Sequence, residues 1–167
     1  YLAEGQIVGQ PIWFDNGTVA PADDAVYFVA DSIPADSNNP YGDRNLYALT
    51  ADGVRKWVYP LGFARWTDTD YFLRGNPGGI ALGSDGDIYA AANKLMKFAP
   101  GGTLLWQSER SSEGDVFNRG PVIGTNSHVY VSSKNNLYAF DAAGKEVWSF
   151  ANVEDILSIS MTDGGNI

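Results

Sequence analysis

The sequence predicts an all-β protein made of β-propeller blades, which are four-stranded antiparallel repeats of about 40–49 residues here. The main observation is a twelve-residue phrase that occurs three times without a gap. This shared phrase has Leu first, an apolar residue fourth, Gly eighth and Trp twelfth, and its copies span residues 46–57, 95–106 and 137–148. The second observation is the spacing of the copies, 49 and then 42 residues, which fits one supersecondary unit per repeat. Sustained helical periodicity is lacking, and the period is too short for a strand–helix–strand unit.

Each copy of the shared phrase reads as strand, turn and strand. The glycines mark the turn, and the tryptophans close the second strand. We expect the tryptophans to fill the contact between neighbouring blades, and one buried Trp per blade to be the largest single stabilising residue. The structural residues predicted in this way are Trp57, Trp106, Trp148, Gly53, Gly102 and Gly144.

The chain is expected to be one partial propeller domain over residues 1–167. Its repeats are predicted at about 8–59, 77–108 and 119–150, and the start of a fourth at 155–167. Because three repeats and a fraction cannot close a ring, the sequence predicts that the propeller is incomplete or is completed by another chain.

In the first repeat, the inner strand is expected at 11–14 rather than at 18–22, and a second β-rich run follows at 25–29. Residues 31–44 are rich in Pro, Ser, Asn, Asp and Gly, which predicts a loop inserted into this repeat. The later repeats follow one pattern of strand, turn, strand, strand, turn and strand. Their strands are predicted at 79–84, 87–92, 95–99, 103–108, 120–125, 128–133, 137–141 and 145–150.

Composition excludes several function classes. The formal net charge is −9, and a surface that negative repels phosphate backbones, so nucleic-acid binding is not expected. The chain has no cysteine, which excludes disulfides, thiolate metal sites and cysteine nucleophiles. No apolar run approaches the roughly 18 residues that a transmembrane helix needs.

The shared phrase is similar to the PQQ-like propeller repeat, whose signature runs Ala-x-Asp, then Gly, then Trp. The third copy matches it best, with Ala139, Asp141, Gly144 and Trp148. The first copy has Thr50 in place of the Asp, and the second has Lys97 and Ala99 in place of the Ala and the Asp. All three copies are one residue shorter before the Gly than the fullest form of the motif. The resemblance covers about three quarters of the chain.

The resemblance implies a propeller that usually has six to eight blades. The family includes quinoprotein dehydrogenases, which hold PQQ and a metal ion on the propeller axis. It also includes non-catalytic scaffolds, such as outer-membrane assembly lipoproteins, and bacterial surface proteins. The missing blades could belong to a longer chain or to a second subunit.

A cluster of aromatic, cationic and acidic residues in the linker between the first two repeats is the candidate ligand-binding site. Such a mixture could stack on a sugar or a planar ligand, or anchor a protein partner. The alternative is that Trp66 and Phe72 simply pack on the neighbouring blade. The cluster consists of Arg65, Trp66, Asp68, Asp70, Tyr71 and Arg74.

No metal site is predicted. Two Asp-x-Asp pairs, Asp68 with Asp70 and Asp85 with Asp87, are weak candidates for calcium because calcium prefers oxygen ligands. Aspartate at a hairpin tip is also what turn geometry favours, and the chain has no EF-hand pattern. The only histidine, His128, is expected to be an exposed hairpin residue and no catalyst.

We therefore expect a non-catalytic extracytoplasmic scaffold or binding module, at the cell surface, outside the cell or in the periplasm. Its expected partners are another protein or the remaining blades of the same propeller, with a homo-oligomer as one form. No catalytic residue and no cofactor is predicted. Two alternatives remain open, part of a quinoprotein dehydrogenase with PQQ and calcium, and a carbohydrate-binding surface propeller.

Overall fold

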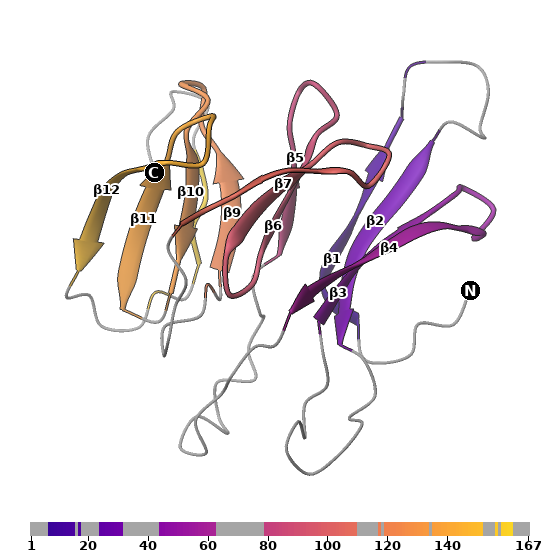
Figure 1. The fold of residues 1–167 in the computed structure, drawn as a ribbon, viewed down its shortest axis with the longest axis horizontal. Helices are drawn as coiled ribbons and strands as arrows, with labels where there is room; N and C mark the ends of the chain where they lie inside the picture. The colour runs from indigo at the N-terminus through magenta and orange to yellow at the C-terminus, as the bar shows by residue number, and fades with distance from the viewer. Residues whose placement is uncertain are drawn as a thin grey trace, which may run out of the picture.

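The computed structural model of the chain describes residues 7–15, 17, 24–31, 44–62, 79–109, 117, 119–133, 135–151, 156 and 158–161. These residues form twelve strands in three separate four-stranded antiparallel sheets, and no helix (Figure 1). Each sheet is one blade, numbered here in chain order. The all-β fold and the four-stranded repeat that the sequence predicts are thereby confirmed.

Within every blade the strands pair in the order of the sequence. Blade one contains β1 Ile7–Phe14, β2 Ala25–Asp31, β3 Arg44–Leu49 and β4 Arg55–Gly62. Blade two contains β5 Ile80–Leu82, β6 Ile88–Ala91, β7 Leu95–Phe98 and β8 Leu104–Gln107. Blade three contains β9 Arg119–Ile123, β10 Val129–Ser132, β11 Asn136–Phe140 and β12 Glu146–Ala151.

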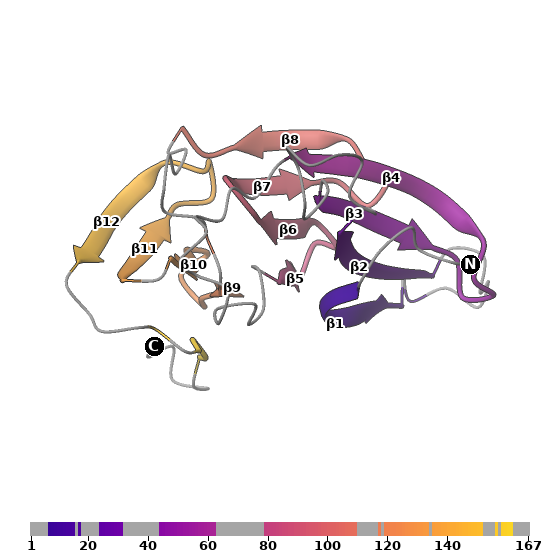
Figure 2. The same cartoon turned by 90° about the horizontal axis from the view of Figure 1, so that it is seen from below.

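The three blades lie side by side in chain order (Figure 1). Figure 2 shows the first strands β1, β5 and β9 together on the inner side, and the last strands β4, β8 and β12 along the outer rim. Burial follows this arrangement. The second strands β6 and β10 are buried at every residue, because a blade or another part of the chain covers both of their faces. The rim strand β8 alternates between half-buried and exposed residues, as a strand with one wet face should.

The predicted strand positions agree with these bounds to within a few residues. The inner strand of blade one begins at Ile7 and includes 11–14, which favours that prediction over a strand at 18–22. Strand β4 continues to Gly62, three residues beyond the predicted end of the first repeat. The inserted loop at 31–44 and the fourth repeat at 155–167 lie largely outside the described residues, and the fourth repeat stays a prediction.

Two apolar cores hold the blades together. The core between blades one and two is centred on Tyr27, Leu46, Ile88 and Phe98, each at most 1% exposed. The core between blades two and three contains Leu95 from the opposite face of blade two. Residues of β10 and β11, together with Phe117, pack against it from the side of blade three. Fully burying one such side chain contributes about 1.5–3 kcal/mol, so these cores outweigh any single contact at the rim.

The tryptophans of the first two blades make the same contact with the next blade. The Trp57 ring lies over Gly102, and its Nε1–H donates to the Pro100 carbonyl oxygen at 3.0 Å. In the next interface, the Trp106 ring lies over Gly144, and its Nε1–H donates to the Ala142 carbonyl oxygen at 3.0 Å. Each indole thus binds the turn of the following phrase at its Gly and at the carbonyl two residues earlier. We call this the inter-blade tryptophan contact.

Glycine is required at these turns for two reasons. Gly102 and Gly144 have φ values of +88° and +81°, a region that residues with a Cβ rarely adopt. A Cβ on Gly102 would also lie 2.8 Å from the Trp57 ring, and one on Gly144 would lie 2.5 Å from the Trp106 ring. The repeated Gly and the repeated Trp are therefore two halves of one contact that joins successive blades.

The prediction of three equivalent buried tryptophans is only partly right. Trp57 and Trp106 are half-buried, and Trp148 is 39% exposed. The Trp148 ring still lies 5.9 Å from Tyr130, as Trp57 lies 5.8 Å from Tyr27 and Trp106 lies 6.0 Å from Tyr89. Among the described residues, however, no turn lies on its free face and no group accepts its N–H. The largest fully buried side chains are Tyr27, Phe98, Phe117 and Phe140.

The departures from the repeat signature have local explanations in the turns. Asp141 accepts hydrogen bonds from the backbone N–H groups of Ala143 and Lys145, each at 2.9 Å. Thr50 takes over part of this role in blade one, since its Oγ1 accepts from the Val54 N–H at 3.0 Å. Ala99 has no side-chain acceptor, and the turn of blade two is closed by backbone hydrogen bonds alone, Gly102 N–H to Ala99 O and Ala99 N–H to Thr103 O.

Candidate functional site

The ligand-binding cluster predicted in the linker, Arg65, Trp66, Asp68, Asp70, Tyr71 and Arg74, lies outside the described residues. It stays a prediction, and so does the Asp68–Asp70 pair. The described part of the chain offers three other features on which a function could rest. They are a groove between blades two and three, an ion-pair cluster on blade two, and exposed apolar side chains on the two end blades.

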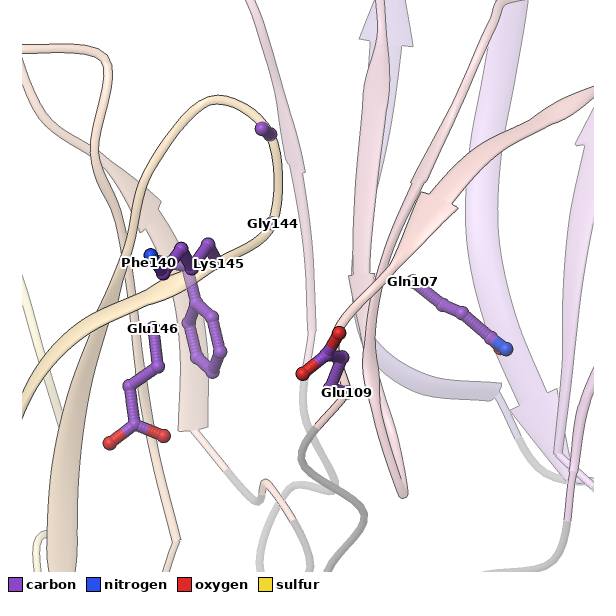
Figure 3. A pocket seen from close by; sticks show the side chains of 7 residues that line it. Gln107, Glu109, Phe140, Gly144, Lys145 and Glu146 are labelled. Carbon is purple, nitrogen blue, oxygen red and sulfur yellow. The ribbon is translucent and has the colours of Figure 1, made fainter.

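The groove lies on the rim between blades two and three and encloses about 760 Å³. One side is formed by the end of β8 and the residues after it, and the other by the turn and first residue of β12. Figure 3 shows the Glu109 carboxylate turned toward blade three, whereas the Gln107 side chain points away from it. The lining residues are Gln107, Glu109, Phe140, Ala143, Gly144, Lys145 and Glu146.

The groove is lined mainly by polar and charged residues. Its charged lining residues are Glu109, Lys145 and Glu146, and Phe140 in the same lining is only 1% exposed. The lining residues include no serine, threonine or histidine that could form a nucleophile–base pair. The groove also adjoins the inter-blade tryptophan contact, because Gly144 belongs to both. Sequence reasoning did not predict this groove, since it forms only when two blades are placed side by side.

The ion-pair cluster centres on Lys97, at the position where blades one and three have alanine. Its Nζ lies 2.8 Å from an Asp87 carboxylate oxygen and 3.4 Å from one of Asp85, and 5.2 Å from the centre of the Tyr89 ring. The Lys97 side chain is only 14% exposed. The predicted calcium candidates Asp85 and Asp87 are thus paired with a lysine. Among the described residues, no group of three or more His, Asp or Glu side chains could hold a metal ion.

The cluster shifts the protonation of its members. Burial alone would lower the pKa of Lys97, but hydrogen bonds to Asp87 and Tyr89 and the negative charge of Asp87 outweigh it and hold that pKa above the ordinary value. Burial alone would raise the pKa of Asp85, but the Asp87 backbone N–H and the charge of Lys97 outweigh it and lower that pKa. Both shifts favour the charged forms, as expected for a structural ion pair.

Replacing Lys97 with methionine is therefore expected to lower the free energy of unfolding by about 1–2 kcal/mol near pH 7, because Asp87 loses a charged hydrogen bond in a poorly exposed position. Because folding lowers the pKa of Asp85, the ionised carboxylate stabilises the fold at pH values above its ordinary pKa of 3.8. This contribution disappears as the pH falls through the folded-state pKa. Because folding raises the pKa of Lys97, the charged lysine stabilises the fold at pH values below its ordinary pKa of 10.5. This contribution disappears as the pH rises through the folded-state pKa. Urea denaturation across the pH range should show a difference from wild type that is greatest between these limits. Lys145→Met, at an exposed turn position, is the control, and a pH-independent difference would contradict the assignment.

Exposed large apolar side chains gather on the end blades. Seven of the eight in the described residues belong to blade one or blade three, and only Leu105 belongs to blade two. On blade one, the face turned away from blade two is covered at its centre, where Phe28 and Tyr47 are only 4% and 3% exposed, so the exposed side chains of this blade lie in β1, β4 and the turn before β4. The seven are Ile7, Trp13, Val54, Val58, Val147, Trp148 and Phe150. Contiguous apolar patches are typical of protein interaction sites, whereas single exposed apolar side chains are common on any protein surface.

His128 lies beside the turn where it was expected, but it is half-buried rather than exposed. Its backbone N–H donates to the Asn126 side chain at 3.1 Å, and its ring centre lies 6.4 Å from that of Tyr130.

In the described part of the chain, no helix is long and apolar enough to cross a membrane.

Comparisons with known proteins agree with the repeat that the sequence indicates. The family model of the outer membrane protein assembly factor BamB, which has PQQ-like repeats, matches residues 84–167, half of the chain. No curated protein matches the chain.

Two of the solved structures that match are gluconolactonase-type proteins. A gluconolactonase from Xanthomonas campestris matches with 16% identity and a TM-score of 0.49, over 86% of this chain and 48% of the other. A candidate gluconolactonase matches with 13% identity and a TM-score of 0.47, over 84% of this chain and 48% of the other. The chain thus spans about half the length of these two proteins.

The family match covers blade three and most of blade two, and it coincides with two of the three copies of the shared phrase. The chain belongs to the family of the outer membrane protein assembly factor BamB, with PQQ-like repeats that form β-propeller blades.

Proposed function

We propose that this chain is a non-catalytic scaffold that binds other proteins during assembly outside the cytoplasm. The observation that carries the proposal is the gathering of exposed apolar side chains on blades one and three. The family name supports the same role, because the matching family model is that of an assembly factor of the outer membrane. The rim groove adds a polar surface beside these apolar faces.

The proposed partners are proteins that bind through the exposed apolar side chains of the end blades. Rigid antiparallel sheets suit this role, since their side chains are fixed before binding and little conformational entropy is lost when a partner docks. The net charge of −9 favours partners with basic surfaces.

Site-specific photo-crosslinking in cells tests the scaffold role. A photoreactive amino acid at Phe150 or Trp13, which are 60% and 52% exposed on the two end blades, should form crosslinks to the same discrete proteins in repeated experiments. The same group at Leu105, 49% exposed on the middle blade, is the matched control and should form far fewer. Equal crosslinking from all three positions, or none from the end blades, would contradict the proposal.

A quinoprotein role finds no support in the described residues. PQQ and calcium need acidic and amide oxygens that converge on one metal, and the described acidic residues form no such group of three. Asp85 and Asp87 are paired with Lys97 instead. Addition of PQQ and calcium, followed by a dye-linked alcohol or glucose oxidation assay, separates this role from the scaffold.

A further inference from the structure

The groove between blades two and three corresponds to a space that is filled in the interface between blades one and two. There the Tyr59 side chain, from the rim strand of blade one, packs against the core that the two blades share. Its ring centre lies 4.7 Å from that of Phe98, with the ring planes at 65°, which is an edge-to-face contact. One aromatic ring from the rim thus fills part of the first interface.

Blade two has a serine where blade one has this tyrosine. Tyr59 is the second residue after the Trp of the shared phrase and pairs with Leu46, the first residue of the phrase. Ser108 is the second residue after Trp106, and its backbone N–H donates to the carbonyl oxygen of Leu95, the first residue of the second copy. The Ser108 Oγ accepts from the Leu95 N–H at 3.1 Å, so this position carries no ring toward blade three.

The groove lies where the ring of such a tyrosine would lie. Its lining consists of the residues before and after Ser108 and of residues from the phrase of blade three. The lining residues Phe140, Ala143, Gly144, Lys145 and Glu146 correspond in order to Phe98, Gly101, Gly102, Thr103 and Leu104 of the first interface. The volume of about 760 Å³ is within the roughly 300–1,000 Å³ of ligand pockets, so an aromatic ring and its neighbouring groups would fit.

A residue from the connection between blades two and three contacts Phe140 but does not fill the groove. The Phe117 ring centre lies 6.0 Å from that of Phe140 and 5.4 Å from that of Tyr138, within the core that these blades share. The groove remains open with Phe117 in this place. Because Phe140 is only 1% exposed, a ring in the groove would meet it at an edge, as Tyr59 meets Phe98.

The groove differs from its counterpart in charge. Glu146 stands where blade two has Leu104, and Glu109 lines the opposite side. Lys145 is the one cationic residue in the described lining. Figure 3 shows the Glu109 carboxylate and the Phe140 ring turned toward each other from the two sides of the groove. A ring held between them would bring a neighbouring cationic group within reach of a carboxylate.

We propose that this groove binds an aromatic side chain that a partner protein carries next to a lysine or arginine on an exposed segment. The ring would take the place that Tyr59 takes in the first interface, and the adjacent cation would pair with Glu109. The net charge of −9 favours a basic segment over an acidic one. This inference rests on the proposed scaffold role and specifies one contact through which a partner binds.

The tripeptide acetyl-Lys-Tyr-Lys-amide is the probe, with acetyl-Lys-Ala-Lys-amide and acetyl-Glu-Tyr-Glu-amide as matched controls. Titration into the isotope-labelled 167-residue chain, followed by NMR, should shift the amide signals of Gly144 and Glu109 in a saturable manner. The alanine peptide should bind at least about tenfold more weakly, because burial of an aromatic ring contributes roughly this factor. The acidic peptide should also bind more weakly, and the difference should shrink as salt is added.

Variants of the chain locate the binding in the groove. Ala143 is exposed and lines the groove, so Ala143→Phe places a ring of the chain's own there and should weaken binding at least about tenfold. Ala142→Phe, at the neighbouring exposed position outside the lining, is the matched control and should bind like wild type. Glu109→Lys leaves the space for the ring and reverses one charge, so it should weaken the basic peptide and strengthen the acidic one. This second variant keeps the test decisive if Ala143→Phe disturbs the turn.

The outcomes separate this inference from the scaffold role. Equal binding of the alanine peptide, or wild-type binding by a folded Ala143→Phe chain, would overturn the aromatic site. Equal binding of the acidic peptide, or no effect of Glu109→Lys, would overturn the basic partner. No saturable change with any of the three peptides would overturn the inference as a whole. Crosslinks from Phe150 and Trp13 without peptide binding would leave the scaffold role standing.

Discussion

Replacing Gly144 with valine is expected to lower the free energy of unfolding by about 3 kcal/mol or more. Two independent costs add up in this substitution. A residue with a Cβ in the left-handed region costs roughly 1–2 kcal/mol, and Gly144 has a φ of +81°. The new side chain also enters the space of the Trp106 ring, which lies 2.5 Å from the position of its Cβ, and overpacking of this kind costs typically 1–3 kcal/mol. Urea denaturation measured by far-UV circular dichroism gives the difference directly.

Other glycines of the chain allow the two costs to be separated. Gly62 has a φ of +90° but open space around its Cβ position, so Gly62→Ala carries only the backbone cost. Gly101 has open space and no positive φ, so Gly101→Ala should be close to neutral. Gly144→Ala should be more destabilising than either of them. If Gly144→Ala and Gly62→Ala cost the same, the ring of Trp106 would not press on the turn as the structure indicates.

The sequence predicted the blades well because local patterns mark each strand, and the shared phrase marks the two outer strands of a blade and the turn between them. In the shared phrase, the Leu at position one and the apolar residue at position four mark a buried strand, and the Gly at position eight marks the turn. Strand and turn can therefore be located from the local pattern alone. Even the deviating residue Thr50 fits this rule, since its hydroxyl accepts the same type of backbone bond as Asp141. Contacts within a blade are local in sequence, and local patterns therefore predict them.

Contacts between blades were predicted less well, because they depend on how two repeats are placed in space. The sequence marked Trp57 and Gly102 as important but did not show that they touch each other across 45 residues. Lys97 looked like a mismatch to the signature, and only the structure shows that it pairs with Asp87. Phe117 lies outside every predicted repeat, yet it is fully buried against Tyr138 and Phe140.

The candidate site shows the same limit. The sequence indicated a dense group of candidate residues in the linker between the first two repeats, and that linker lies outside the described residues. The features that the structure does describe, the rim groove and the exposed apolar side chains of the end blades, combine residues from separate strands or separate blades.

The second large effect is expected for Trp57→Ala, which should lower the free energy of unfolding by about 3 kcal/mol. The substitution removes the ring from Gly102, the contact with Tyr27 at 5.8 Å between ring centres, and the hydrogen bond to the Pro100 carbonyl. Trp57→Phe keeps most of the packing and loses the hydrogen bond, so it should cost only about 1 kcal/mol.

Comparison of the three tryptophans then tests whether they act between blades or within one blade. Trp106→Ala should match Trp57→Ala, because both indoles bind a following turn through the same two groups. Trp148→Ala should cost much less, about 1 kcal/mol, because its ring contacts Tyr130 of its own blade but no described turn. Three equal losses would mean that the indoles stabilise their own blades, and the inter-blade tryptophan contact would then contribute little. A small loss at Trp148 alone would show that most of the stabilisation at Trp57 and Trp106 comes from the turn of the next blade.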